Sequence, residues 1–259
     1  MAEATNPAAS NRIRAVWAAG RCAVLGWLQI PSALTAETLA LCGYDGLVID
    51  LQHSPTDFVT AVAMMTAIEG RGAEPFVRVS ANDAAEIGRM LDAGAYGVIA
   101  PMVETMEQAR ALADAVHYPP LGGRSYGPRR PLLRYGKDYV KTASETIVTL
   151  AMIETRRGLE NLEGILSIDG FDGVFIGPAD LALALGKAPV ADSTDEAVVA
   201  AVSHIRGVAH AKGKRAGIFC AGAEFARARM ADGFDLVTIA SDLALLSNAA
   251  RQSIAAVRR

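Results

Sequence analysis

Residues 46–79, GLVIDLQHSPTDFVTAVAMMTAIEGRGAEPFVRV, join two short apolar runs through a longer amphipathic stretch. The apolar runs, at 46–50 and 75–79, contain few polar residues, which is typical of parallel strands that are covered on both faces. Between them, apolar residues recur at helical spacing from Asp57, a favourable N-cap residue, to Gly70, a favourable C-cap residue. This stretch is therefore predicted to form a strand–helix–strand unit.

The same alternation of short apolar runs and amphipathic stretches extends over most of the chain. The predicted strands are residues 23–30, 46–50, 75–79, 96–100, 147–154, 172–177, 215–220 and 234–240. The clearest helical patterns between them are at residues 57–70, 83–94, 105–116 and 195–213. Eight strands alternating with helices predict an α/β fold with a single (β/α)₈ TIM-barrel domain over residues 1–259. An open doubly wound sheet is the alternative, but no G-x-G-x-x-G motif follows the first strand.

Composition excludes several classes of protein. The chain has 259 residues, of which 51% are hydrophobic and 20% charged, so it has enough apolar surface to fold. Its net charge of −3 gives no electrostatic reason to expect nucleic acid or an anionic membrane as a partner. Cys22, Cys42 and Cys220 lie too far apart to suggest a zinc site or a disulfide framework. With no apolar leader and no run of 18 apolar residues, we expect a soluble cytoplasmic protein.

Two segments depart from the regular pattern. Residues 117–136, between the fourth and fifth strands, are rich in Gly, Pro and Arg, and long loops of this kind are usually functional or mobile. Residues 241–259 are predicted to form a helix. Its apolar positions form one stripe that must pack on another surface: Leu243, Leu246, Ala250, Ile254 and Val257.

Polar residues follow four of the predicted strands, at the end of the barrel where active sites of this fold lie. They are Asp50 with the adjacent Gln52 and His53, then Arg78, Glu154 and Asp180. Taken singly, Asp180 is explained as a helix cap, and Glu154 and His53 as solvated loop residues. Arg78 is harder to explain in this way, because a buried guanidinium without anionic partners is costly. Their joint placement favours one site.

The chemistry of this group points to an enolate-forming reaction. Glu154 and Asp180 are a pair of hard oxygen ligands, which suits Mg²⁺ or Mn²⁺ better than zinc. The backbone at the predicted helix start, residues 177–180, would favour a carboxylate or phosphate. Arg78 would stabilise an oxyanion while His53 moves a proton, as enolisation of a 2-keto acid requires. A Schiff-base mechanism would need a lysine at a strand end. The candidate lysines all lie elsewhere: Lys137, Lys141, Lys187, Lys212 and Lys214.

Residues 152–186, MIETRRGLENLEGILSIDGFDGVFIGPADLALALG, closely resemble the HpcH/HpaI family of metal-dependent hydroxy-ketoacid aldolases. The E-T-R-x-G-L-x-N-L and F-I-G-P-A-D-L motifs carry this resemblance most specifically. DGLVIDLQHSPTD, PFVRV and MLDAGAYGVIAPMVET are similar to the same family in the same order, as is GIFCAGAEFARARMADGFDLVTIASD. The similarity covers the chain from about Ala23 to Leu246.

The resemblance implies roles for individual residues. Glu154 and Asp180 match the metal ligands of the family, and Arg78 matches the arginine that faces the keto oxygen of pyruvate. His53 matches the catalytic histidine, and Asp92 matches the acid that orients it. The substrate-binding positions are Arg78, Gly177, Pro178, Ala179 and Asp180, where the backbone amides of Ala179 and Asp180 receive the substrate carboxylate.

Other features of the family carry over less directly. Many relatives have Glu immediately before the histidine, where this chain has Gln52. The loop that contains Arg124, Tyr126 and Arg129, followed by Arg130, is where we expect selectivity for the aldehyde acceptor. Family members are commonly hexamers in which subunits exchange the C-terminal helix, which would cover its apolar stripe.

We therefore interpret the chain as a class II aldolase. It would reversibly cleave a 4-hydroxy-2-keto acid to an aldehyde and pyruvate, or a close analogue such as hydroxypyruvate, through an enolate. The cofactor would be a divalent metal ion: Mg²⁺, Mn²⁺ or Co²⁺. Two alternatives stay open: a lyase of the acyl-CoA type within the same barrel superfamily, and a non-catalytic metabolite-binding barrel.

Overall fold

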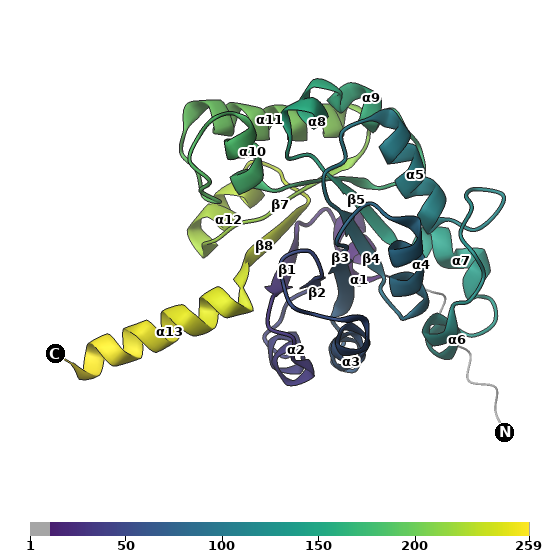
Figure 1. Cartoon of the computed structure of the whole chain (residues 1–259), viewed down its shortest axis with the longest axis horizontal. Coiled ribbons are helices and arrows are strands. Elements are labelled where there is room, and N and C mark those ends of the chain that lie inside the picture. Colours follow the sequence, from purple (N-terminus) through teal and green to yellow (C-terminus); the bar gives the residue numbers. More distant parts are fainter. Residues whose placement is uncertain (1–10, 259) are drawn as a thin grey trace.

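The computed structural model describes residues 11–258 and contains a closed barrel of parallel strands in the order β1 to β8 (Figure 1). The strands are β1 (Ala23–Leu28), β2 (Gly46–Asp50), β3 (Glu74–Arg78), β4 (Gly97–Ala100), β5 (Val148–Met152), β6 (Gly173–Ile176), β7 (Arg215–Ile218) and β8 (Leu236–Ser241). Each of the predicted strands is present with small shifts at its ends. The barrel closes through pairing of β1 with β8, so the predicted TIM barrel is confirmed and the open sheet is excluded.

Helices between the strands return the chain from the carboxyl end of one strand to the amino end of the next, while one more helix precedes the first strand and another follows the last. They are α1 (Arg12–Ala18), α2 (Ala33–Ala40), α3 (Phe58–Glu69), α4 (Ala84–Asp92), α5 (Met106–Val116), α6 (Arg129–Tyr135), α7 (Tyr139–Thr146), α8 (Arg156–Glu160), α9 (Leu162–Leu166), α10 (Pro178–Ala184), α11 (Glu196–Ala211), α12 (Ala223–Ala231) and α13 (Asp242–Val257). The four clearest sequence patterns correspond to α3, α4, α5 and α11. Asp57, Asp83 and Thr105 cap the first three, each accepting a hydrogen bond from a backbone N–H in the first turn.

The apolar core has two parts. One lies between the strands and the surrounding helices. The other fills the barrel interior and includes α1, whose Ile13, Val16 and Trp17 are buried with Leu25 and Leu236 from β1 and β8. Because α1 directly precedes the amino end of β1, this packing closes the amino-terminal end of the barrel. The carboxyl ends of the strands are left as its accessible mouth.

The predicted loop at residues 117–136 contains α6. No side chain caps this short helix, and its position depends on tertiary contacts. Arg130 donates to Glu69 at 2.6 Å and to the carbonyl oxygen of Ala93 at 2.9 Å, and Arg134 reaches Glu74 at 3.3 Å. The helix was missed because the flanking Gly and Pro residues dominate the local pattern.

The last helix, α13, is present as predicted but extends away from the barrel (Figure 1). Asp242 is its one buried residue within the described chain, while Leu246 is 61% exposed and Ile254 is 52% exposed. The apolar stripe is therefore not covered by the chain itself. Within residues 11–258, no helix has both the length and the apolar character needed to cross a membrane.

Candidate active site

A cavity of about 240 Å³ lies at the carboxyl ends of the strands. Its lining comes from most of the barrel: Trp27, Gln29, His53, Arg78, Met152, Phe175, Gly177, Pro178, Ala179, Asp180, Ala191 and Phe219. Trp27 forms an aromatic wall with Phe175, at 5.7 Å between ring centroids, and with Phe219, at 5.4 Å. The structure thus brings His53, Arg78 and residues 177–180 together, as the sequence predicts.

A larger hollow, of about 570 Å³, lies at the amino-terminal end beside α1. Most of the basic side chains that line it are paired with groups of the protein itself. Arg14 pairs with Asp172 at 2.7 Å, and the Lys214 ammonium donates to the carbonyl oxygen of Phe171 at 2.8 Å. Because this end of a TIM barrel generally serves stability, the smaller cavity is the candidate active site.

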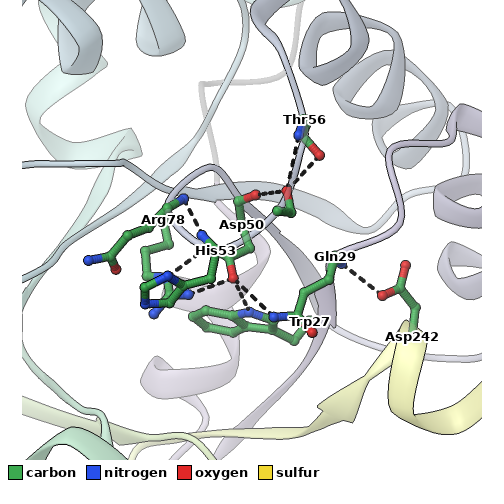
Figure 2. Close-up of polar contacts among 9 residues, drawn as sticks. Trp27, Gln29, Asp50, His53, Thr56, Arg78 and Asp242 are labelled. Atoms are coloured by element: carbon green, nitrogen blue, oxygen red, sulfur yellow. Dashed lines mark hydrogen bonds and ion pairs between the residues drawn. The ribbon is translucent and has the colours of Figure 1, made fainter.

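Arg78 is held in the cavity by a carboxylate to which the sequence analysis gave no role, that of Asp50 (Figure 2). Nε of Arg78 donates to Oδ1 of Asp50 at 2.9 Å, and Nη2 donates to Oδ2 at 2.5 Å. The guanidinium also lies 4.9 Å from the ring centroid of Trp27. Burial alone would raise the pKa of Asp50, but the hydrogen bonds and charge of Arg78 outweigh it, and the pKa is lowered. The carboxyl of Asp50 is therefore ionised at neutral pH.

Asp50 also fixes the loop that carries His53. Its Oδ1 accepts from the backbone N–H groups of Gln52 at 3.0 Å and His53 at 3.1 Å. This places the exposed imidazole of His53 at the cavity, where its side chain makes no hydrogen bond to the rest of the described chain. Asp50 is the register partner of Arg78 in neighbouring strands. The sequence shows an acid and an arginine at the ends of two predicted strands, but only the strand register pairs them.

Glu154 follows β5 beside the cavity and is only 3% exposed. Its Oε1 accepts from the backbone N–H of Met102 at 2.9 Å, whereas its buried Oε2 has no hydrogen-bond partner among the described residues. Burial, reinforced by the negative charge of Asp180, raises the pKa of Glu154 to about 7. An incompletely satisfied carboxylate near a second acid is an arrangement that a cation would stabilise.

Glu154 and Asp180 fit a divalent metal ion that keeps part of its coordination for water or substrate. No group of three or more His, Cys, Asp or Glu side chains within residues 11–258 is arranged to hold a metal. Two carboxylates with open positions suit a hard cation such as Mg²⁺ better than a closed zinc site. Gly177 leaves the necessary space, because a Cβ atom at this position would lie 2.5 Å from Oε2 of Glu154.

The structure does not bring Asp92 to His53. Asp92 is the last residue of α4, which returns the chain towards the amino end of β4, whereas His53 follows the carboxyl end of β2. Its Oδ1 instead accepts from Nη2 of Arg124 at 2.8 Å. The prediction that Asp92 orients His53 is therefore not supported within one chain, and Asp50 makes the contact to the His53 backbone.

The predicted acceptor loop also lies outside the cavity in the single chain. Arg124 is buried against Asp92, with its guanidinium 4.5 Å from the ring centroid of Tyr118. Tyr126 and Arg129 are exposed, and Arg130 is paired with Glu69. None of these residues lines the cavity. Their role in acceptor selection stays a prediction.

Comparison with known proteins adds an independent line of evidence. Residues 24–249 match the family model described as HpcH/HpaI aldolase/citrate lyase. The chain is 59% identical over 248 residues to the hydroxypyruvate/pyruvate aldolase of Rhizorhabdus wittichii, covering 96% of this chain and 99% of that one. It is 35% identical over 244 residues to the 5-keto-4-deoxy-D-glucarate aldolase of Shigella dysenteriae, covering 93% and 94% of the two chains. A crystal structure of an HpcH/HpaI aldolase/citrate lyase family protein from Burkholderia cenocepacia superposes with a TM-score of 0.85 at 31% identity, covering 92% and 95%.

Proposed function

Because the chain belongs to the HpcH/HpaI aldolase/citrate lyase family and is a metal-dependent aldolase, we propose that it cleaves 4-hydroxy-2-keto acids reversibly. The products are an aldehyde and pyruvate or hydroxypyruvate. The observation that carries this proposal is the meeting of Arg78, His53 and Asp180 at one small cavity, with the buried carboxyl of Glu154 beside it. A cavity of about 240 Å³ with an aromatic wall suits a small keto acid.

Arg78 stabilises the negative charge that develops on the keto oxygen. Two of its nitrogens are bound to Asp50, and Nη1, which has no hydrogen bond to the described residues, is left for a substrate oxygen. Because Asp50 orients the guanidinium before substrate arrives, little reorganisation is needed when the charge forms. The N–H groups of Ala179 and Asp180, in the first turn of α10, receive the substrate carboxylate.

His53 moves the proton. In the cleavage direction it accepts the proton of the C4 hydroxyl, the C3–C4 bond breaks, and the electron pair of that bond moves into the enolate as the aldehyde leaves. The enolate then takes a proton at C3 to give the keto-acid product, and the reverse sequence forms the bond. A divalent cation held by Glu154 and Asp180 supplies Lewis-acid polarisation of the keto group when bound. Mg²⁺, Mn²⁺ and Co²⁺ are the ions we propose.

A homo-oligomer, with the hexamer of the family as the expected form, is also part of the proposal. The exposed Leu246 and Ile254 on α13 support it, since the barrel of the same chain does not cover them. The three free cysteines support a reducing, cytoplasmic location.

The proposed function is tested by assaying retro-aldol cleavage over a panel of 4-hydroxy-2-keto acids before and after exhaustive chelation. We expect chelation to abolish product formation, and Mg²⁺, Mn²⁺ or Co²⁺ to restore it. The Glu154→Gln variant should need a higher metal concentration while keeping the circular dichroism of the native barrel, because Glu154 lies at its rim. Full activity after chelation, or no cleavage of any keto acid with metal present, would overturn the proposal.

A further inference from the structure

The carboxylate of Asp242 is buried in an unusual position for a residue in the first turn of a projecting helix. It is 4% exposed and accepts hydrogen bonds from the backbone N–H groups of Gln29 at 2.7 Å (Figure 2) and of Ile30 at 3.1 Å. It also accepts from the N–H of Leu243 at 2.7 Å. The hydrogen-bond donors to this carboxylate are therefore all backbone N–H groups, and two of them belong to the segment that follows β1.

The end of β8 is shaped so that Asp242 reaches this segment. Leu25 pairs with Thr238 and Trp27 pairs with Ser241, so β8 carries one more residue than β1 over this interval. Within the bulge, Ala240 has a φ of 50°, a left-handed conformation that is unfavourable for a residue with a side chain. Bulges of this kind re-aim the residues that follow them and are frequent beside active sites. Here the redirected residue is Asp242.

The end of β1 and the segment that follows it each supply one donor to Asp50. Nε1 of Trp27 donates to Oδ2 of Asp50 at 3.2 Å, and Nε2 of Gln29 donates to the same oxygen at 3.4 Å. The same oxygen accepts from Nη2 of Arg78. A continuous series of contacts therefore runs from α13 through the end of β1 to the guanidinium in the cavity (Figure 2).

We propose that Asp242 is a positioning residue for the aldol reaction: by holding the backbone of Gln29 and Ile30, it keeps Asp50 and Arg78 in the geometry that stabilises the enolate. This inference rests on the proposed function. It links the base of α13 to catalysis, so that the placement of that helix affects the site although no side chain of α13 lines the cavity.

A purely local role for Asp242 in starting α13 is the competing explanation. Ser241 already serves that purpose, since its hydroxyl accepts from the N–H of Ala244 at 3.2 Å. The side chain of Ser241 makes no hydrogen bond to Gln29 or Ile30 within the described chain. It is therefore a matched control, because its removal weakens the same helix start without releasing the β1 end.

The experiment compares Asp242→Asn with Ser241→Ala in the metal-loaded enzyme. Asn places an N–H donor where one carboxylate oxygen now accepts. Two N–H groups then face each other, and a hydrogen bond to the segment that follows β1 is lost. We expect kcat to fall roughly ten- to hundred-fold in Asp242→Asn with little change in KM, because a small displacement of the oxyanion-stabilising group is enough. Ser241→Ala should keep wild-type kcat. A double variant of Asp242→Asn with Gln29→Ala should be no slower than the slower single variant, since both act through the same contacts.

A second measurement reports the same displacement without substrate. The chain has two tryptophans, so in a Trp17→Phe background the emission of Trp27 alone reports the environment of the β1 end. Asp242→Asn should shift this emission and Ser241→Ala should not, and this result does not depend on which substrate the enzyme cleaves. Unchanged emission with unchanged kcat would overturn the inference, as would equal losses in the two variants. If Asp242→Asn does not fold, Gln29→Ala must lower kcat with the fold intact, and wild-type kcat in that variant would also overturn it.

Discussion

At the scale of single residues, the buried ion pair of Arg78 and Asp50 orients the guanidinium group in the active site. A buried ion pair is not in itself a source of stability, because the desolvation of both charges offsets their attraction. The contribution of this pair is to orientation. Asp50 accepts hydrogen bonds from two nitrogens of the guanidinium and thereby fixes the direction of the third. We therefore expect substitutions at Arg78 to affect the transition state more than the binding of substrate.

Replacing Arg78 tests this expectation. Arg78→Ala should lower kcat by about 10²-fold or more, because it removes a donor whose interaction is strongest when the enolate forms. Arg78→Lys should recover little, since an ammonium group has no planar fork for the carboxylate of Asp50. Arg89→Lys is the matched control, because Arg89 stacks on Phe58 at 4.3 Å outside the cavity. A rise in KM alone would show that Arg78 binds substrate and transition state equally.

The raised pKa of Glu154 makes the stability of the metal-free protein depend on pH. The native carboxyl titrates at about 7 instead of 4.5, so the native state holds its proton more tightly than the unfolded chain. The stabilising contribution is complete below about pH 4.5 and is lost as the pH rises through about 7, with an upper limit of roughly 3 kcal/mol. Thermal unfolding of the chelated protein at pH 5 and pH 8 should show this loss. Glu154→Gln should show a smaller one, and an identical pH dependence in both would contradict the assignment.

At the scale of helices and strands, the sequence predicted what is decided locally. The eight strands are short apolar runs between turns, and the helices begin at residues whose side chains accept from the first turn. The short helix α6 was not predictable in this way, because it has no side-chain cap and is held by ion pairs to Glu69 and Glu74 from distant elements. Local patterns therefore predicted the barrel but not how its longest connection folds.

The same distinction applies to the site. Arg78, His53 and Asp180 were predicted to meet because the carboxyl ends of parallel strands share one end of a barrel. Asp92 was placed beside His53 by resemblance alone. Because α4 runs towards the amino end of β4, its last residue, Asp92, lies away from His53 in the single chain. The role of Asp50 depended on strand register, which neither composition nor spacing specifies. A residue's location in the site was thus predictable where it follows from the residue's position along its own strand. It was less predictable where it depends on how two elements pair with each other.

At the scale of the whole molecule, α13 is the part that the single chain leaves incomplete. It has 16 residues, with Leu243 at 53% exposure and Leu246 at 61%. Most of the stability of a helix in a protein comes from packing of its apolar face, so a helix with an uncovered apolar stripe needs a surface to pack on. A second copy of the chain is the occupant we propose, and the position of Asp242 at the base of α13 means that this packing would also steady the active site.

The double variant Leu246→Glu with Ile254→Glu tests this assembly. If α13 packs on a neighbouring subunit, each substitution removes about 1.5–3 kcal/mol of apolar burial and adds the cost of a desolvated charge. We therefore expect light scattering to show a smaller species than the wild type at the same concentration, with the circular dichroism of the barrel retained. Gln252→Glu is the control for charge, since it adds one negative charge to the same helix outside the apolar stripe, where the double variant adds two within it. An unchanged molar mass in the double variant would show that the stripe is not the contact surface. A smaller species whose kcat has also fallen would indicate that assembly steadies the β1 end through Asp242.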